Sequence, residues 1–295
     1  MNNSTKSYLL TIVVILFWAT SATAFKIGLT YVSPYILLFY SSLISTFIYL
    51  VAIFFQKKTA LLKIYSKKDF GQAALLGLLN PFGYYVVLFQ AYDLLPGQIA
   101  MSLNYGWPIA LSVLSIPILK HTITFKQVLS IMISFIGVVI IATRGELLSF
   151  RGVSLTGVIL ALSSTVIWAT FWLVNARDKH DPVIKLFWGF CFAVLYTIIL
   201  SPFFGGLDFP PLTAFYAISY ISFFEMGITF IIWLMALNLT TNASKIGNMI
   251  FITPFLSLLF LNLFLDEQLY ISTFIGLLLI ISGIVFQGIK KRVRS

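Results

Sequence analysis

The chain contains ten long runs of apolar residues, separated by short polar segments. A transmembrane helix needs about 20 consecutive apolar residues, whereas a strand of a membrane barrel is about 10 residues of alternating character. The runs are continuous, so they predict an all-α polytopic membrane protein. Hydrophobic residues make up 60% of the 295 residues and charged residues only 9%, which excludes a soluble domain. The ten predicted spans cover residues 7–29, 34–56, 70–92, 96–119, 127–143, 156–175, 183–204, 213–237, 242–265 and 270–289.

An internal repeat divides these spans into two groups of five. Adding 146 to the residue number takes Pro108 to Pro254 and Gly137 to Gly283 without a gap. An odd number of spans in each half makes the two halves enter the membrane from opposite sides, as in the inverted repeats of alternating-access carriers. In such carriers the substrate binds near the midplane, between the repeats. The two predicted halves are residues 1–148 and residues 149–295.

The distribution of lysine and arginine predicts the orientation. With the N-terminus inside, fifteen of the 19 basic residues fall in inner segments, and only Arg144 and Arg151 fall in outer loops. Cytoplasmic loops carry the excess of basic residues in membrane proteins, so both termini are expected in the cytoplasm. The net charge of +10 is therefore a topology signal and does not indicate nucleic-acid binding.

Two predicted spans contain polar residues beside a proline. In the fourth span, Pro108 cannot donate to the carbonyl of Asn104, which leaves a free backbone acceptor beside a free side-chain amide. In the third span, Pro81 has the same effect next to Asn80, and Tyr84 lies one helical turn further on. Both places are expected to be polar walls of a cavity, although interhelical hydrogen bonding explains Asn80 and Tyr84 equally well.

Glu225 is the only carboxylate deep inside a predicted span. A charge there is costly, so it is expected to face a cavity or a partner. It either binds a substrate ammonium or carries a coupling proton, or it has a structural role, in which it is neutralised by a lysine such as Lys245 or hydrogen-bonded as a neutral acid. Trp18 and Trp168 occupy corresponding places in the two halves, near the middle of their spans, and Asn248 is a lone amide that also suits helix packing. The expected substrate-binding residues are Trp18, Asn80, Tyr84, Asn104, Tyr105, Trp107, Trp168, Glu225 and Asn248.

Two segments resemble a known family. The run from Pro254 to Gly283, with Leu-Asp-Glu-Gln-Leu at 265–269, and its weaker copy after Pro108 are similar to the EamA branch of the drug/metabolite transporter superfamily. The resemblance covers about residues 9–289. Asn-Tyr-Gly-Trp-Pro at 104–108 resembles the Asn-Tyr-x-Trp-Pro segment of bacterial aromatic amino acid exporters of that branch. The resemblance implies an inner-membrane exporter of amino acids or related metabolites, with a central cavity lined by both halves. Asp266-Glu267 departs from the Gly-Glu that is commonest in the family after the ninth helix.

The sequence thus favours a secondary carrier of small metabolites over an enzyme. It has no Gly-x-x-x-x-Gly-Lys-Ser/Thr segment for ATP, and Cys191 is the only cysteine, which leaves no thiolate cluster for a metal. No cofactor is expected. Exporters of nucleobases or toxic cations, a lipid-modifying enzyme and a channel stay open as alternatives. The expected partners are the lipid bilayer, a small-molecule substrate and, as candidate coupling ion, a proton. The chain is long enough to work as a monomer or a weak homodimer.

Overall fold

The computed structural model describes residues 2–119, 125–145, 153–175, 178–240, 246 and 249–288, and within these the chain is helical without strands. The α-helices are α1 (Asn3–Leu29), α2 (Pro34–Phe55), α3 (Lys67–Gly77), α4 (Tyr84–Leu94), α5 (Gly97–Asn104), α6 (Trp107–Leu119), α7 (Phe125–Ala142), α8 (Leu155–Asn175), α9 (Pro182–Leu200), α10 (Leu212–Ile221), α11 (Ile228–Leu239), α13 (Thr253–Leu265) and α14 (Ile271–Gly288). Two π-helical segments, η2 (Leu78–Gly83) and η4 (Ser222–Gly227), join α3 to α4 and α10 to α11, and the short 3-10 helices are η1 (Thr59–Ile64), η3 (Ser201–Phe204) and η5 (Ile250–Ile252).

The helices confirm the predicted polytopic membrane fold. Within the described residues, six helical segments are long and apolar enough to cross a membrane, and three shorter ones are apolar. The segments α5 and α6 together fill the remaining predicted span, the fourth. Large apolar side chains point outward from the bundle, for example Phe47 (64% exposed) and Phe54 (70% exposed). Such a surface is stable only against lipid, because water would have to hydrate it.

Local sequence signals start several helices. Ser33 accepts a hydrogen bond from the amide of Ile36, and Pro34 occupies the first turn of α2. Asp181 caps α9 in the same way, because its carboxylate accepts from the amide of Val183 at 2.9 Å. These caps satisfy amides that have no partner within the helix.

Among the described residues, three spans are broken near their middles. In the third, Asn80 leaves the helical conformation (φ −148°, ψ 124°) next to a cis peptide bond to Pro81. In the fourth, the turn at Tyr105 and Gly106 separates α5 from α6. Both breaks lie beside a proline, Pro81 or Pro108, which lacks the N–H that a continuous helix needs. The third break, η4 in the eighth span, was not predicted from the sequence, because no proline marks it.

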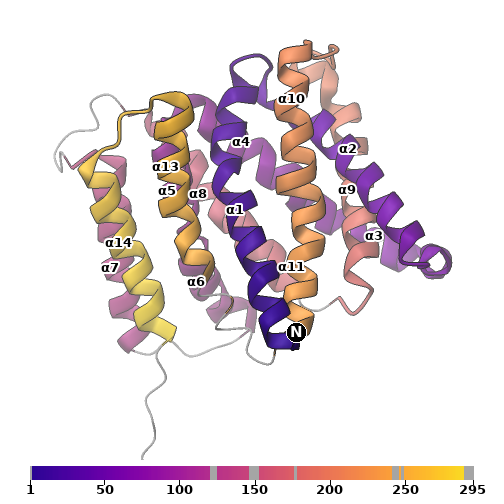
Figure 1. The fold of residues 1–295 in the computed structure, drawn as a ribbon, viewed down its shortest axis with the longest axis horizontal. Coiled ribbons are helices and arrows are strands. Elements are labelled where there is room, and N and C mark those ends of the chain that lie inside the picture. The colour runs from indigo at the N-terminus through magenta and orange to yellow at the C-terminus, as the bar shows by residue number, and fades with distance from the viewer. Residues whose placement is uncertain are drawn as a thin grey trace, which may run out of the picture.

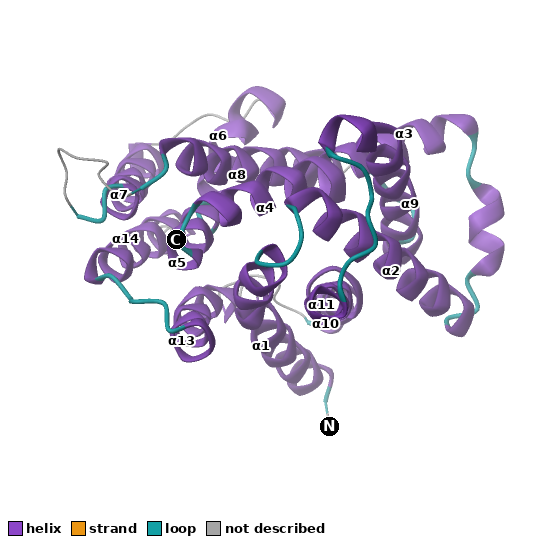
Figure 2. Ribbon diagram, turned by 90° about the horizontal axis from the view of Figure 1, so that it is seen from above, coloured by secondary structure: helices purple, strands orange, loops and turns teal. Residues whose placement is uncertain are grey.

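The helices run side by side, with the N-terminus on one side of the bundle (Figure 1). We call this side, which carries Asn3, Phe55, Lys67 and Asn175, the N-terminal side, and the other the opposite side. Viewed from above, α7 and α14 form a pair at one end and α2, α3 and α9 lie at the other (Figure 2). The helices α1, α4 and α8 lie between them, and α1 packs on α10, α11 and α13. The centre of the bundle is thus built from residues on both sides of position 148.

The pair α7 and α14 packs through small residues in a reciprocal pattern. A Cβ on Gly137 would lie 2.5 Å from the carbonyl oxygen of Gly276, and one on Gly283 would lie 2.7 Å from that of Ser130. Gly276 and Gly283 are the residues that the offset of 146 assigns to Ser130 and Gly137. Reciprocal contacts of this kind are those of a two-fold axis. They support the division at 148/149, which stays a prediction.

Replacing Gly137 with Ala tests this close approach. The added methyl group forces the two backbones apart, and we expect it to destabilise the protein by about 1–3 kcal/mol. The measurement is thermal unfolding of the purified protein in detergent. Gly71→Ala in α3 is the matched control, because a Cβ there meets no atom within 4 Å. A Gly137→Ala protein that unfolds at the wild-type temperature would show that the helices are not in this contact.

Candidate functional site

The carboxylate of Glu225 lies where three spans meet. Its Oε2 accepts a hydrogen bond from Ser21 Oγ of α1 at 2.7 Å, and its Oε1 accepts one from Tyr85 Oη of α4 at 2.9 Å. Within the described part of the chain, no lysine, arginine or histidine lies within 4.0 Å of this carboxylate. Lys245, the expected structural partner, is outside the described residues. Two neutral donors, rather than a cation, therefore hold the carboxylate in place.

Glu225 reaches this position because η4 distorts its helix. Tyr49 of α2 donates to the carbonyl of Met226, and Ser45, one turn earlier on α2, donates to the carbonyl of Ser222 at 3.2 Å. These hydroxyls satisfy carbonyl groups of the distorted turn, which hydrocarbon alone would leave without partners. Single π-helical turns often occur at functional sites, where the extra residue redirects a side chain.

A second polar chain lies beside the first. Tyr84 Oη donates to Asn104 Oδ1 at 3.1 Å, and Asn104 Nδ2 donates to Ser164 Oγ of α8 at 2.9 Å. The rings of Tyr84 and Tyr85 are 4.8 Å apart, so the two chains are neighbours. The amide predicted from the fourth span thus links α4, α5 and α8 at the centre of the bundle.

The two tryptophans that recur in the halves meet a shared aromatic residue. The rings of Trp18 and Trp168 lie 5.9 Å and 6.3 Å from that of Phe230, which belongs to α11. Trp168 also packs on Tyr84 at 4.6 Å, and Trp18 on Trp233 at 6.0 Å. These contacts place aromatic walls around the polar chains. We call Ser21, Tyr84, Tyr85, Asn104, Trp168 and Glu225 the central cluster.

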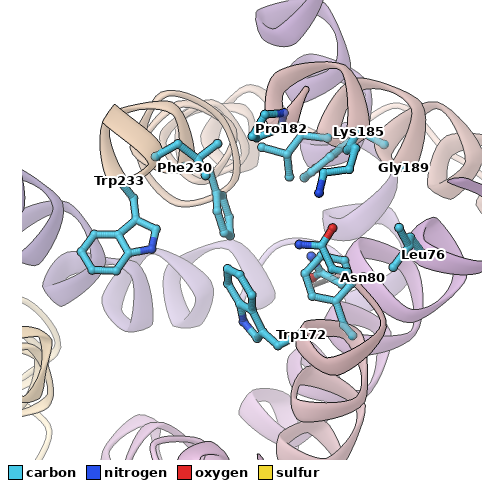
Figure 3. Close-up of a pocket in the computed structure, with 13 residues that line it drawn as sticks. Leu76, Asn80, Trp172, Pro182, Lys185, Gly189, Phe230 and Trp233 are labelled. Atoms are coloured by element: carbon cyan, nitrogen blue, oxygen red, sulfur yellow. The ribbon is translucent and has the colours of Figure 1, made fainter. Parts of the chain in front are cut away.

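Figure 3 shows a pocket of about 100 Å³. It lies toward the N-terminal side, because its lining includes Asn175 at the end of α8 and Pro182 at the start of α9. It is bounded by the end of α3 with η2, the last turns of α8, the first turns of α9, and α11. Phe230 belongs to both its lining and the aromatic walls above. Its polar side chains are Asn80, Asn175 and Lys185, and its aromatic ones are Phe171, Trp172, Phe190, Phe230 and Trp233.

The structure brings some of the predicted residues together and not others. Asn80 lines the pocket, and Tyr84, Asn104, Trp168 and Glu225 belong to the central cluster, which Trp18 reaches through Phe230. Tyr105 is half-buried at the break of the fourth span. Trp107 begins α6 beyond that break and, among the described residues, makes no ring contact or side-chain hydrogen bond to the central cluster. Asn248 lies outside the described residues.

Sequence reasoning missed Ser21, Tyr85, Phe230, Trp172 and Lys185. Ser21 and Tyr85 become visible only through their shared partner, Glu225. Lys185 lies one turn into α9, where its charge had counted only as a topology signal. The sequence did offer one signal. Asp181-Pro182 starts a helix, which places Lys185 inside that helix rather than in the preceding loop.

Hydrogen bonds between α5 and the segment before α14 hold the opposite side together. Glu267 accepts from the amides of Gly97 and Gln98, at 3.0 Å each, and so caps the N-terminus of α5 with a negative charge. The side chain of Gln98 donates to the carbonyl of Gln268 at 2.6 Å and accepts from the amide of Tyr270 at 3.0 Å. We call these residues the opposite-side clamp. The clamp gives Glu267 a role that its sequence position alone did not assign.

The chain matches the EamA-like transporter family twice, over residues 5–143 and 155–288. The chain belongs to this family. Two proteins of Archaeoglobus fulgidus described as uncharacterized transporters are 23% and 26% identical to it, each over 98% of this chain and 99% of their own length. The uncharacterized transporter YyaM of Bacillus subtilis is 24% identical over 71% of this chain and 70% of its own length. A crystal structure that covers 96% of both chains has a TM-score of 0.67 at 20% identity, which shows the same fold.

Family and fold together establish a multi-pass membrane transporter of the EamA family. Both matched regions contribute to the site. The segments α1, α4 and α5 belong to the first region, and α8, η4 and α11 belong to the second. The hydrogen-bonding groups of the central cluster and the aromatic rings around them suit a small amphipathic ligand.

Glu267→Ala tests the opposite-side clamp. Loss of a helix cap costs about 0.5–2 kcal/mol, so we expect α5 to separate from its partners about 2- to 30-fold more often. The measurement is the rate at which a thiol reagent labels a cysteine placed at the buried Ala100, in a Cys191→Ser background in detergent.

The matched control for this labelling experiment is Gln268→Ala. Gln268 binds Gln98 through its backbone carbonyl, so its side chain can be removed without loss of that bond. We expect the control to label at the parent rate. Equal labelling rates in the Glu267→Ala protein and its parent would show that the carboxylate does not hold the clamp closed.

Proposed function

We propose that this EamA-family transporter exports small zwitterionic or aromatic metabolites, above all neutral and aromatic amino acids, across the inner membrane. The observation that carries the proposal is the carboxylate of Glu225, which has two neutral donors and no cation beside it in the described structure, next to aromatic walls. A carboxylate and π-faces together attract an ammonium group, and the rings bind an apolar side chain. Neutral and aromatic amino acids carry both an ammonium group and an apolar side chain.

Alternating access is the proposed mechanism. The two halves rock about a site formed by spans one, three, four, six, eight and nine, and the breaks at η2, at Tyr105-Gly106 and at η4 let these helices bend. The excess of basic residues supports placing the N-terminal side in the cytoplasm. In the described conformation the clamp joins helices on the opposite side, and the pocket lies toward the N-terminal side. This arrangement suits a state that loads substrate from the cytoplasm.

A second candidate is the export of organic cations, because Glu225 and the surrounding rings also suit a cation without a carboxylate. Counterflow in proteoliposomes separates the candidates. Vesicles are loaded with a mixed pool of amino acids, nucleobases, sugars and an organic cation, and the exchanging species are identified.

We expect saturable exchange of aromatic and other neutral amino acids in this assay. Asn104→Ala should abolish most of it, because Tyr84 and Ser164 lose their shared partner in the central cluster. Asn262→Ala is the matched control, since the amide of Asn262 binds only the carbonyl of Glu267 on an exposed surface. Exchange of the organic cation alone would favour the second candidate, and exchange of sugars or nucleobases alone would contradict both.

Glu225 is also the proposed carrier of a coupling proton. Wild-type vesicles are expected to accumulate the substrate against its gradient when a pH gradient is imposed. In Glu225→Gln vesicles the amide cannot release a proton and also binds the substrate ammonium less strongly. Accumulation should therefore be lost, whereas counterflow, which moves no net proton, should be weakened but remain measurable at saturating substrate. Asp93→Asn, at an exposed position near the end of α4, is the matched control and should keep accumulation. Undiminished accumulation by Glu225→Gln would exclude this residue as the proton carrier.

A further inference from the structure

Lys185 places a positive charge at the pocket without a carboxylate to neutralise it. Its Nζ donates to the backbone carbonyl of Asp178 at 3.0 Å, and no carboxylate of the described residues lies within 4.0 Å of it. The two nearby acids have other partners, because Asp178 binds His180 at 2.7 Å and Asp181 binds Lys58 at 2.8 Å. An ammonium group has three donors, so Lys185 keeps two for a ligand.

Two other polar groups of the pocket lack partners. Asn80 is 4% exposed, and its Oδ1 accepts no hydrogen bond in the described structure. Trp172 Nε1 is likewise buried without an acceptor. Leaving a buried polar group unpaired is unfavourable, and a ligand that supplies the missing partner recovers that free energy. Figure 3 shows Asn80, Trp172 and Lys185 around one space.

The remaining walls are mostly aromatic or aliphatic. Phe171, Phe230 and Trp233 line the pocket together with Leu76 and Leu186. Such walls bind an aromatic ring by burial and by edge or face contacts. The pocket therefore combines a cation, an indole donor, an amide acceptor and an apolar enclosure.

We propose that this pocket is a binding site for an aromatic carboxylate, in which Lys185 and the indole N–H of Trp172 hold the carboxylate. Asn80 Oδ1 accepts a hydrogen bond from the amino group where the ligand has one, and the rings enclose its aromatic part. The site rests on the proposed function, because it is the place where an exported aromatic amino acid is first bound on the N-terminal side. It also disfavours cations that lack a carboxylate, since Lys185 repels them.

The test is direct binding to the purified full-length protein, measured by calorimetry with three probes of one shape. Phenylalanine carries both charged groups, 3-phenylpropionate only the carboxylate, and phenethylamine only the ammonium. Lys185→Met is expected to weaken the binding of phenylalanine and 3-phenylpropionate at least about tenfold, the loss typical of a charged hydrogen bond. Binding of phenethylamine should not weaken and should tighten, because the repulsion from Lys185 is removed. Lys185→Arg should restore most of the affinity. Lys179→Met, an exposed lysine in the loop before α9, is the matched control for net charge.

Trp172→Phe provides an independent variant that keeps the ring and removes only the N–H donor. It should weaken 3-phenylpropionate more than phenethylamine, and it decides the question if Lys185→Met does not fold. Wild-type affinity of both variants for the two carboxylates, or equal losses for all three probes, would overturn the proposal. If the site is overturned in this way but amino acid counterflow is still observed, the proposed function stands. Lysine-dependent binding of 3-phenylpropionate without any amino acid exchange would support the site and contradict the export function.

Discussion

Backbone hydrogen bonding in lipid is the constraint on which the rest of the structure depends. Hydrocarbon offers no partner for a free N–H or C=O, so a chain of this composition must cross the membrane as helices. A helix can be interrupted there only where other protein groups replace the lost bonds. The hydroxyls of Ser45 and Tyr49 do this for η4, so the break and the carboxylate that it presents depend on α2. The requirement to satisfy these groups gathers the irregular backbone at the centre of the bundle, where a polar ligand can also be bound.

Much of this architecture could be predicted because its signals are local. Apolar runs predicted the spans to within a few residues wherever their ends lie in the described part of the chain, which leaves out the start of the ninth. Pro34 marked the start of α2, and Asn80-Pro81 marked the break in the third span. The amide at Asn104 was identified as a candidate because a proline follows it, and it lies in the central cluster. Prolines and polar residues within the membrane are informative because each destabilises a transmembrane helix. Their presence therefore indicates a structural or functional role.

The parts that could not be predicted depend on contacts between distant residues. Nothing in Ser222–Gly227 marks a π-helical turn, which is held by α2 from more than 170 residues earlier. Tyr85 and Phe230 are two among 14 tyrosines and 29 phenylalanines, so composition gives neither a special place. Lys185 looked like one more basic residue at a span end, and only the packing of α9 on α3 and η2 turns it toward a pocket. The roles of these residues depend on tertiary contacts, so the neighbouring sequence does not reveal them.

The separation of two opposite charges gives the site its proposed selectivity. Glu225 and Lys185 would attract each other strongly if they touched in a medium of low dielectric, and a buried pair of that kind has little left for a ligand. Here the carboxylate is held by Ser21 and Tyr85, and the ammonium is held by a backbone carbonyl. Phe230 belongs both to the pocket wall and to the aromatic contacts beside the central cluster. Each charge therefore lacks a charged partner within the described structure. A zwitterion with an aromatic side chain can match Lys185 with its carboxylate and, after moving past Phe230, Glu225 with its ammonium.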